Sequence, residues 1–154
     1  TNALLELLPT KTLGTPERAE LQRRFGWEWN GMRLHELYFE NLSPETQVLG
    51  DGSLKEKLVA TFGSLEAWQE DFLGLAAMRG IGWALLVEDT ESKMLFNTWV
   101  TEHDGGHLAG TRPLLVLDVF EHAYLSDYGI KRAEYLAAFA RHIHWNAVEK
   151  RFGQ

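Results

Sequence analysis

The most constraining feature of the sequence is an apolar run at residues 114–117 that ends at the carboxylate of Asp118. Short apolar runs of this kind are typical of buried strands, so the run predicts a strand that carries Asp118 at its inner end. His122 follows four residues later, and a carboxylate and an imidazole at this spacing can converge on one cation. A buried carboxylate without a partner costs several kcal/mol in desolvation. The residues alone leave two interpretations open, a metal site or an Asp–His hydrogen bond that closes a turn.

The composition is that of an ordinary folded protein and excludes several classes of site. The 154 residues, 45% of them hydrophobic, are enough for one substantial core. No apolar run approaches about 18 residues, so we expect no membrane span. The absence of cysteine excludes disulfides, zinc–thiolate sites and iron–sulfur clusters, and fits a cytoplasmic location. The net charge of −7 argues against nucleic acid as a partner, because binding to phosphates requires a basic surface.

Helix signals dominate the first half of the chain. Thr15 followed by Pro16 is typical of a helix start, and apolar residues at helical spacing extend that helix to about Leu42. Gly31 lies inside this helix, where glycine costs about 1 kcal/mol relative to alanine, so we expect a packing or site reason for it.

Two serines are predicted to cap the next helices. Ser53 and Glu56 have the spacing of a capping box, at the start of a helix that runs toward Phe62, and Ser64 caps the helix that follows Gly63. Residues 3–8, 132–142 and 146–152 also have helical patterns, and three strands are predicted at residues 83–88, 94–101 and 114–120. Helices, an antiparallel meander and further helices in this order indicate an α+β fold.

Several segments resemble one known family. Residues 118–124 spell D-V-F-E-H-A-Y, which closely resembles the D-V-W-E-H-A-Y signature of the iron/manganese superoxide dismutase family. Residues 82–87 are similar to the family's G-W-x-W-L-V strand, with Leu85 in place of the second Trp. Residues 35–44 resemble H-x-x-x-[FW]-x-N-L-S-P, and residues 131–135 with 144–145 resemble the R-x-x-Y…N-W tail. The resemblance extends in the right order over almost all of the chain from about Thr15 onward.

The resemblance implies a fold in two parts. Residues 1–52 would form an N-terminal helical hairpin, and residues 53–154 a C-terminal α/β domain with a three-stranded antiparallel sheet flanked by helices. The family's first metal ligand is a His on an initial long helix, followed eight residues later by a Tyr, but no His precedes His35 and no Tyr precedes Tyr38. We therefore expect the chain to begin partway through that helix, as a divergent member in which the first helix is largely missing.

The resemblance also implies an activity, the disproportionation of superoxide to oxygen and hydrogen peroxide at one iron or manganese ion per chain. The implied metal ligands are His35, Asp118 and His122. Imidazole and carboxylate ligands suit iron or manganese better than magnesium or calcium, and zinc, which would accept them, cannot change its oxidation state. The fourth position would be filled by water or by an acidic residue of the N-terminal part, namely Glu6, Glu17 or Glu20.

Three further residues receive catalytic roles from the resemblance. His103 is expected to hydrogen-bond toward the solvent ligand of the metal without binding the metal, the alternative being a surface turn histidine. Trp83, together with Phe120, is expected to form a wall of the metal pocket, although plain core aromatics would look the same. Glu121 is expected to pair with the ligand histidine of a second subunit, which favours a homodimer or a dimer of dimers. A salt bridge within the chain is the alternative for Glu121.

Other functions stay open at this point. A non-catalytic metal-binding or structural protein on the same fold would follow from the absence of the first-helix ligand. A metal-dependent hydrolase with Glu36 or Glu102 as base has little support, because the sequence has no H-E-x-x-H motif. The remaining histidines are expected to be structural, as a loop cap or in the tail helices: His107, His142 and His144.

Overall fold

The computed structural model describes residues 1–153 and confirms the α+β fold. Over these residues the helices are α1 (Asn2–Leu7), α2 (Pro16–Glu40), α3 (Ser53–Phe62), α4 (Leu65–Ala76), α5 (Leu125–Tyr128), α6 (Arg132–Arg141) and α7 (Trp145–Phe152). The strands are β1 (Gly82–Asp89), β2 (Leu95–Thr101) and β3 (Thr111–Asp118), and single 3-10 turns lie at η1 (Leu8–Thr10) and η2 (Glu121–Ala123).

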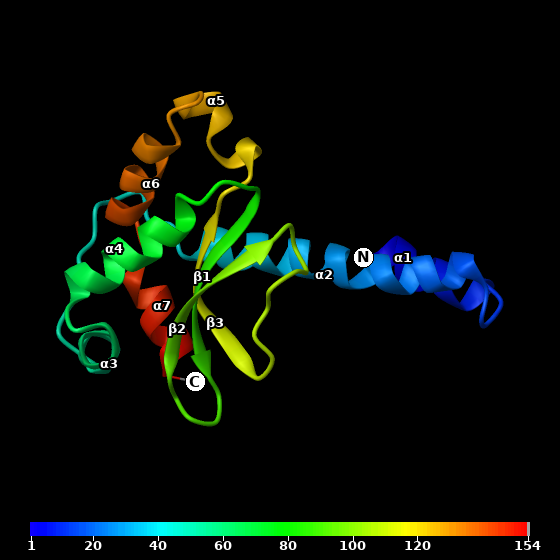
Figure 1. The fold of residues 1–154 in the computed structure, drawn as a ribbon, viewed down its shortest axis with the longest axis horizontal. Coiled ribbons are helices and arrows are strands. Elements are labelled where there is room, and N and C mark those ends of the chain that lie inside the picture. The colour runs from blue at the N-terminus through cyan, green and yellow to red at the C-terminus, as the bar shows by residue number, and fades with distance from the viewer. Residues whose placement is uncertain (154) are drawn as a thin grey trace.

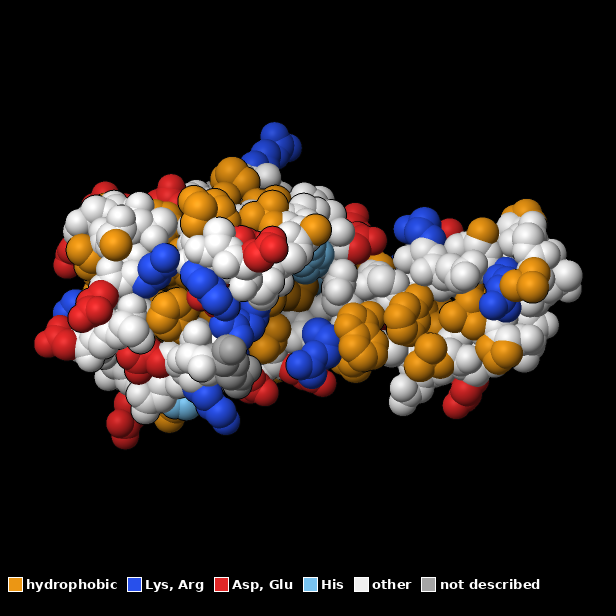
Figure 2. All heavy atoms as spheres, turned by 90° about the horizontal axis from the view of Figure 1, so that it is seen from below, with side chains coloured by type: hydrophobic (Ala, Val, Ile, Leu, Met, Phe, Trp, Pro, Cys, Tyr) orange, Lys and Arg blue, Asp and Glu red, His pale blue; other side chains and the backbone are white. Residues whose placement is uncertain are grey.

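The long helix α2 reaches out from the rest of the molecule (Figure 1). It begins as predicted, with Pro16 in its first turn and the Thr15 hydroxyl accepting a hydrogen bond from the Arg18 amide. Its buried residues, Gly31, Leu34 and Tyr38, all lie in its C-terminal half. Figure 2 shows apolar side chains exposed on the projecting part of the molecule, where α1 lies beside α2. The C-terminal half alone therefore packs on the sheet, and this half carries His35.

The helices do not have the character of membrane spans. The longest, α2, has 25 residues and carries charged side chains along its whole length. Within residues 1–153 there is no helix that is both long and apolar enough to cross a membrane.

The sheet has the strand order β2-β1-β3, with both pairings antiparallel. The central strand β1 is buried from Gly82 to Glu88, and only Asp89 at its end is partly exposed. Trp83 pairs with Asp118 at one end of the sheet, and Glu88 pairs with Arg112 at the other. Strand β3 is thus an edge strand that carries Asp118 at its last position, as the apolar run predicted, although it starts at Thr111 rather than at residue 114.

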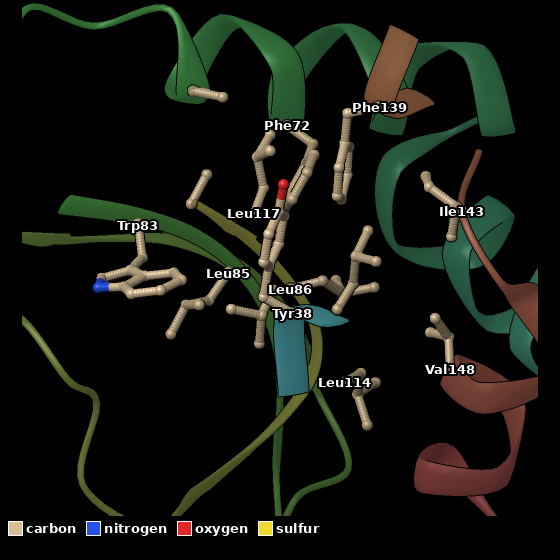
Figure 3. Packing of buried hydrophobic residues seen from close by; sticks show 14 of the residues in the cluster. Tyr38, Phe72, Trp83, Leu85, Leu86, Leu114, Leu117, Phe139, Ile143 and Val148 are labelled. Atoms are coloured by element: carbon tan, nitrogen blue, oxygen red, sulfur yellow. The ribbon is translucent and has the colours of Figure 1, made fainter. Parts of the chain in front are cut away.

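The core lies between the sheet and the helices. Figure 3 shows Tyr38, Phe72, Phe139 and Val148, from four different helices, packed against the side chains of β1 and β3. Trp83 lies at one end of this cluster, away from Val148 (Figure 3). Burial of large apolar side chains stabilises a fold by about 25 cal/mol for each Å² removed from water, so this core fixes the relative position of α2, β1 and β3.

One of the two predicted helix caps was wrong, and two short elements were not predicted. Ser53 forms no capping box, because it is already the first helical residue and Gly52 is the N-cap, with no side-chain hydrogen bond. Ser64 does cap α4, with its hydroxyl accepting a bond of 3.0 Å from the Ala67 amide. The short elements η2 and α5 between β3 and α6 were not anticipated, although His122 lies in the first of them.

Candidate metal centre

Three side chains from three different elements meet at the end of the sheet. His35 comes from α2, Asp118 from the last position of β3, and His122 from η2. The Nε2 atom of His35 lies 3.5 Å from Asp118 Oδ2 and 3.5 Å from His122 Nε2, and His122 Nε2 lies 3.1 Å from Asp118 Oδ2. Within residues 1–153 they form the single group of three acidic or imidazole residues close enough to share one ion.

The spacing and the chemistry of these three donors fit one metal ion. Two atoms that each lie about 2.1 Å from an ion can be no more than about 4.2 Å apart, and all three separations meet this limit. Two imidazole nitrogens and one carboxylate oxygen are ligands that iron, manganese and zinc accept. The donors therefore match a mononuclear transition-metal site. None of Glu6, Glu17 and Glu20 belongs to this group.

The Asp118 carboxylate is the buried centre of the group. Its side chain is 2% exposed, and its Oδ1 accepts a 2.9 Å hydrogen bond from the Phe120 amide. Burial raises the pKa of the Asp118 carboxyl above its ordinary value, although that amide and the two histidines act in the opposite direction. A buried carboxylate is costly unless a positive partner compensates it, and a bound cation would supply that partner.

The orientation of His35 is fixed by its own helix. Its Nδ1 lies 2.6 Å from the Gly31 carbonyl oxygen, one turn earlier in α2. A carbonyl only accepts, so Nδ1 carries the proton and the neutral ring presents the Nε2 lone pair to the side of Asp118 and His122. The indole of Trp83 meets the His35 ring edge-on at 4.8 Å between centroids. A His35 ring with its proton on Nδ1 and a free lone pair on Nε2 is the tautomer that a metal-binding histidine needs.

His103 is buried beside the group rather than placed on a surface turn, so the surface-turn alternative was wrong. The Trp83 indole N–H donates to His103 Nδ1 at 3.0 Å. An indole only donates, so the neutral His103 ring carries its proton on Nε2. Burial first, and then the neighbouring His35 and His122, lower the pKa of His103. The rings of His103 and His35 are 5.9 Å apart.

Gly31 has the site reason that its position in mid-helix suggested. A Cβ at Gly31 would lie 3.1 Å from Cδ2 and 3.2 Å from Nε2 of His103. Such contacts are tighter than side-chain atoms normally make, so the missing Cβ lets the His103 ring approach the backbone of α2. The carbonyl of the same residue holds His35. One glycine thus sets the positions of two of the histidines.

Aromatic side chains surround the group on the side of the protein interior. Trp83 is fully buried, and Phe120 stacks on His122 at 5.2 Å and on His103 at 4.8 Å between centroids. Trp27 meets the edge of His103 at 4.4 Å. The sequence interpretation did not include Trp27, whose only signal was its helical spacing of four and eight residues from Gly31 and His35.

A cavity of about 420 Å³ opens beside His35 of α2 and His103 of the turn after β2. Its lining includes His35, His103, Trp27 and Gly31, and across from them Thr1 and Asn2. The side chain of His122 is 58% exposed in this chain. The two imidazole donors, His35 and His122, are therefore reachable from solvent, while the Asp118 carboxylate is not.

The other candidate residues have ordinary partners. Glu121 is exposed, and within residues 1–153 it forms no ion pair, so the expected alternative of a salt bridge inside the chain is not found. Glu36 pairs with Arg33, and Glu102 accepts the Trp27 indole N–H at 2.9 Å, so neither is a free base. Three histidines contact backbone carbonyls, as expected of structural residues: His107, His142 and His144.

Comparison with known proteins places the chain in a family. The family model for the C-terminal domain of iron/manganese superoxide dismutases matches residues 50–151. Two manganese superoxide dismutases of Haloferax volcanii are each 42% identical over 125 residues, which cover 81% of this chain and 62% of each relative. An iron superoxide dismutase of Cupriavidus metallidurans is 40% identical over 146 residues, 94% of this chain and 70% of that protein.

The chain thus spans less than two thirds of the length of the two Haloferax proteins. The family model nevertheless covers the segment that carries Asp118 and His122, and the alignment with the Cupriavidus protein, which includes 94% of this chain, also covers His35. This chain belongs to the iron/manganese superoxide dismutase family.

Proposed function

We propose that this chain is a superoxide dismutase that binds one iron or manganese ion through His35, Asp118 and His122. The observation that carries the proposal is the mutual approach of His35 Nε2, Asp118 Oδ2 and His122 Nε2 to within 3.5 Å. The relatives are named manganese or iron superoxide dismutases, and this supports the same substrate and the same two metals here.

In this proposal the bound metal supplies one-electron redox chemistry, so that one superoxide is oxidised to oxygen and the next, with two protons, is reduced to hydrogen peroxide. Asp118 contributes the negative charge of the ligand set from inside the protein, where water does not compete for it. His35 keeps its Nε2 lone pair available because Gly31 holds the proton on Nδ1. Trp83 and Phe120 exclude water from the inner side of the site.

His103 would act next to the metal rather than on it. The Trp83 indole occupies its Nδ1, so the Nε2–H is the group left to donate a hydrogen bond. The lowered pKa keeps the ring neutral near pH 7. His103 can therefore donate a hydrogen bond without adding a positive charge that would repel the metal. Donors beside a metal tune its potential and the protonation of its bound solvent.

The test uses the purified chain loaded with manganese or iron. We expect about one metal per chain by elemental analysis and consumption of superoxide in proportion to that metal. His122→Ala should lose both, whereas His144→Ala, which alters a histidine whose ring bonds to the Glu40 carbonyl of α2, should lose neither. Metal binding without superoxide consumption would contradict the enzyme and favour a non-catalytic metal-binding protein, an alternative that the 58% exposure of His122 also favours.

We further propose a homodimer, or a dimer of dimers, that forms through the surface around Glu121. Glu121 is exposed, and exposed apolar residues follow it at Leu125 and Ile130. A carboxylate next to a metal ligand is well placed to pair with an imidazole of a second copy.

The match of a C-terminal-domain model to residues 50–151 supports the division of the chain into residues 1–52 and 53–154. A cytoplasmic location stays a prediction from the cysteine-free composition.

A further inference from the structure

Within residues 1–153 the outer edge of β3 has no neighbouring strand, because the sheet order is β2-β1-β3. Unpaired backbone groups at a buried edge are costly unless other groups bond to them. Here side chains from three helical segments take the place of a strand. They bond to the outward-facing backbone of the alternate residues Leu114, Val116 and Asp118.

Asn41, which follows the last residue of α2, occupies the middle of this edge. It is fully buried, and its carboxamide bonds both to the N–H of Val116 at 3.0 Å and to the carbonyl of Val116 at 3.1 Å. Its amide group also donates to the Tyr38 carbonyl, and its oxygen also accepts from Arg151. All four hydrogen bonds that a carboxamide can make are therefore formed.

Arg151, from α7, holds the same junction from the other side. Its Nη1 donates to Asn41 Oδ1 at 3.2 Å and to the Leu114 carbonyl at 2.9 Å. Its Nη2 donates at 2.9 Å to the Leu37 carbonyl and to the Glu40 carboxylate. One guanidinium thus bonds at the same time to the last turn of α2, to Asn41 and to β3, so Arg151 fixes the end of α2 against β3.

The junction lies close to two of the proposed metal ligands. His35 lies in α2, and Asn41 follows it by six residues, just after the helix ends. In β3, Val116 is two residues from Asp118. His35 and Asp118 come from elements that are far apart in sequence, so their separation of 3.5 Å depends on how α2 lies on β3. A small rotation of the helix end would move His35 away from Asp118.

We propose that Asn41 and Arg151 are positioning residues of the metal centre, which set the distance between His35 and Asp118 by fixing the end of α2 on the edge of β3. They touch neither metal nor substrate. The inference rests on the proposed function, since it concerns the same metal site. It adds a role for α7, an element that contributes no metal ligand.

The chain offers a matched control at the opposite end of the sheet. Arg112 pairs with the buried Glu88 at 2.6 Å and also donates to the Phe152 carbonyl of α7. It thus also joins α7 to the sheet through a partly buried guanidinium, but at the end that lies away from Asp118. Arg112→Met should lower stability for the same reasons as Arg151→Met, without reaching the metal ligands.

The test measures the binding of Mn²⁺ alone by calorimetry, well below the thermal midpoint of each variant, with circular dichroism to verify folding. Arg151→Met and Asn41→Asp should weaken Mn²⁺ binding by about 10- to 100-fold, as loss of supporting interactions around a metal typically does. Arg112→Met should leave the affinity within about twofold of the parent. Arg151→Lys keeps the charge but cannot reach four acceptors, so it should give an intermediate loss of Mn²⁺ affinity. This variant tests the positioning role if the other variants do not fold.

A second measurement separates a role in positioning the metal ligands from a general loss of protein stability. The visible absorption spectrum of the Co²⁺-loaded protein reports the geometry of the ligand set, so it should change in Arg151→Lys at saturating Co²⁺ but not in Arg112→Met. Unchanged affinity and spectrum in the Arg151 variants, with the parent binding Mn²⁺ normally, would overturn the positioning role alone. Failure of the parent chain to bind Mn²⁺ at all would instead contradict the proposed function together with this inference.

Discussion

At the scale of single residues, the site joins a buried carboxylate, Asp118, to two imidazoles that approach it from α2 and from the turn after β3. The sequence identified these three, because the four-residue spacing of Asp118 and His122 and the motif around His35 are local signals. It did not identify what holds them. The contacts of His103 with Trp27 and Gly31, or of Asn41 with Val116, join residues about 75 positions apart. Such pairs arise from packing and leave no periodic pattern in the sequence.

A first prediction concerns Gly31. Gly31→Ala should raise helix propensity by about 1 kcal/mol, but it should also displace His103, whose ring is held by Trp83, Phe120 and Trp27 and cannot easily move. We expect metal content to be kept and superoxide consumption to fall by about 10- to 100-fold.

The control for Gly31 lies in the same helix. An added Cβ at Gly26 meets no atom within 4 Å, so Gly26→Ala should gain the helix propensity without loss of activity. Equal activity in the two variants, each with full metal content, would show that His103 does not depend on the space left by Gly31.

A second prediction concerns Asp118. Asp118→Asn removes the desolvation cost of a carboxylate that is 2% exposed, while the new amide oxygen can still accept from the Phe120 amide. We expect the unfolding free energy of the metal-free protein to rise by about 1–2 kcal/mol and metal binding to be lost.

Chemical denaturation and metal titration of the same preparations measure both quantities. Asp51→Asn, which alters an exposed carboxylate paired with Lys55, should change neither by more than about 0.5 kcal/mol. A less stable metal-free Asp118→Asn protein would mean that the carboxylate is already compensated by the two histidines.

A third prediction returns to His103 itself. His103→Ala should keep the metal, because the ring is not one of the three converging donors. Superoxide consumption should fall by about 10- to 100-fold, since the donor beside the metal is removed. Full activity at full metal content would reduce His103 to a core residue that packs on Trp83 and Phe120.

At the scale of elements, the helix and strand signals predicted type and order correctly but misplaced some ends. The start of α2 was correct because Thr15 and Pro16 act within one turn. Strand β3 begins three residues before its apolar run because Arg112 continues to pair with Glu88, a long-range contact. The capping box at Ser53 was wrong because Gly52 takes the N-cap position. Local signals therefore determined these elements, and tertiary pairing adjusted their limits.

The two serines give the fourth prediction. Ser64→Ala removes a side-chain bond to the Ala67 amide and should cost about 1 kcal/mol of unfolding free energy. Ser53→Ala removes no cap bond and, because alanine has the higher helix propensity, should be neutral or slightly stabilising. Equal losses in thermal or urea denaturation would restore Ser53 as the cap of α3.

At the scale of the whole molecule, the metal site lies at one end of the sheet. The exposed carboxylate of Glu121 is there directly followed in sequence by the exposed imidazole of His122. If this surface joins two copies, Glu121→Ala should weaken the dimer by more than about tenfold, because an uncompensated imidazole would be left at the interface. Sedimentation velocity over a range of concentrations measures this. Glu91→Ala, which alters an exposed acid in the turn between β1 and β2, is the matched change and should have no effect. A monomer at every concentration would contradict the dimer.

The proposed activity requires that His35, Asp118 and His122 bind one redox metal. Anomalous diffraction from crystals grown with Mn²⁺, recorded on both sides of the manganese absorption edge, tests it directly. We expect one manganese peak per chain, about 2.0–2.3 Å from His35 Nε2, an Asp118 carboxylate oxygen and His122 Nε2. Crystals that contain manganese but give a peak elsewhere, or no peak between these three side chains, would contradict it.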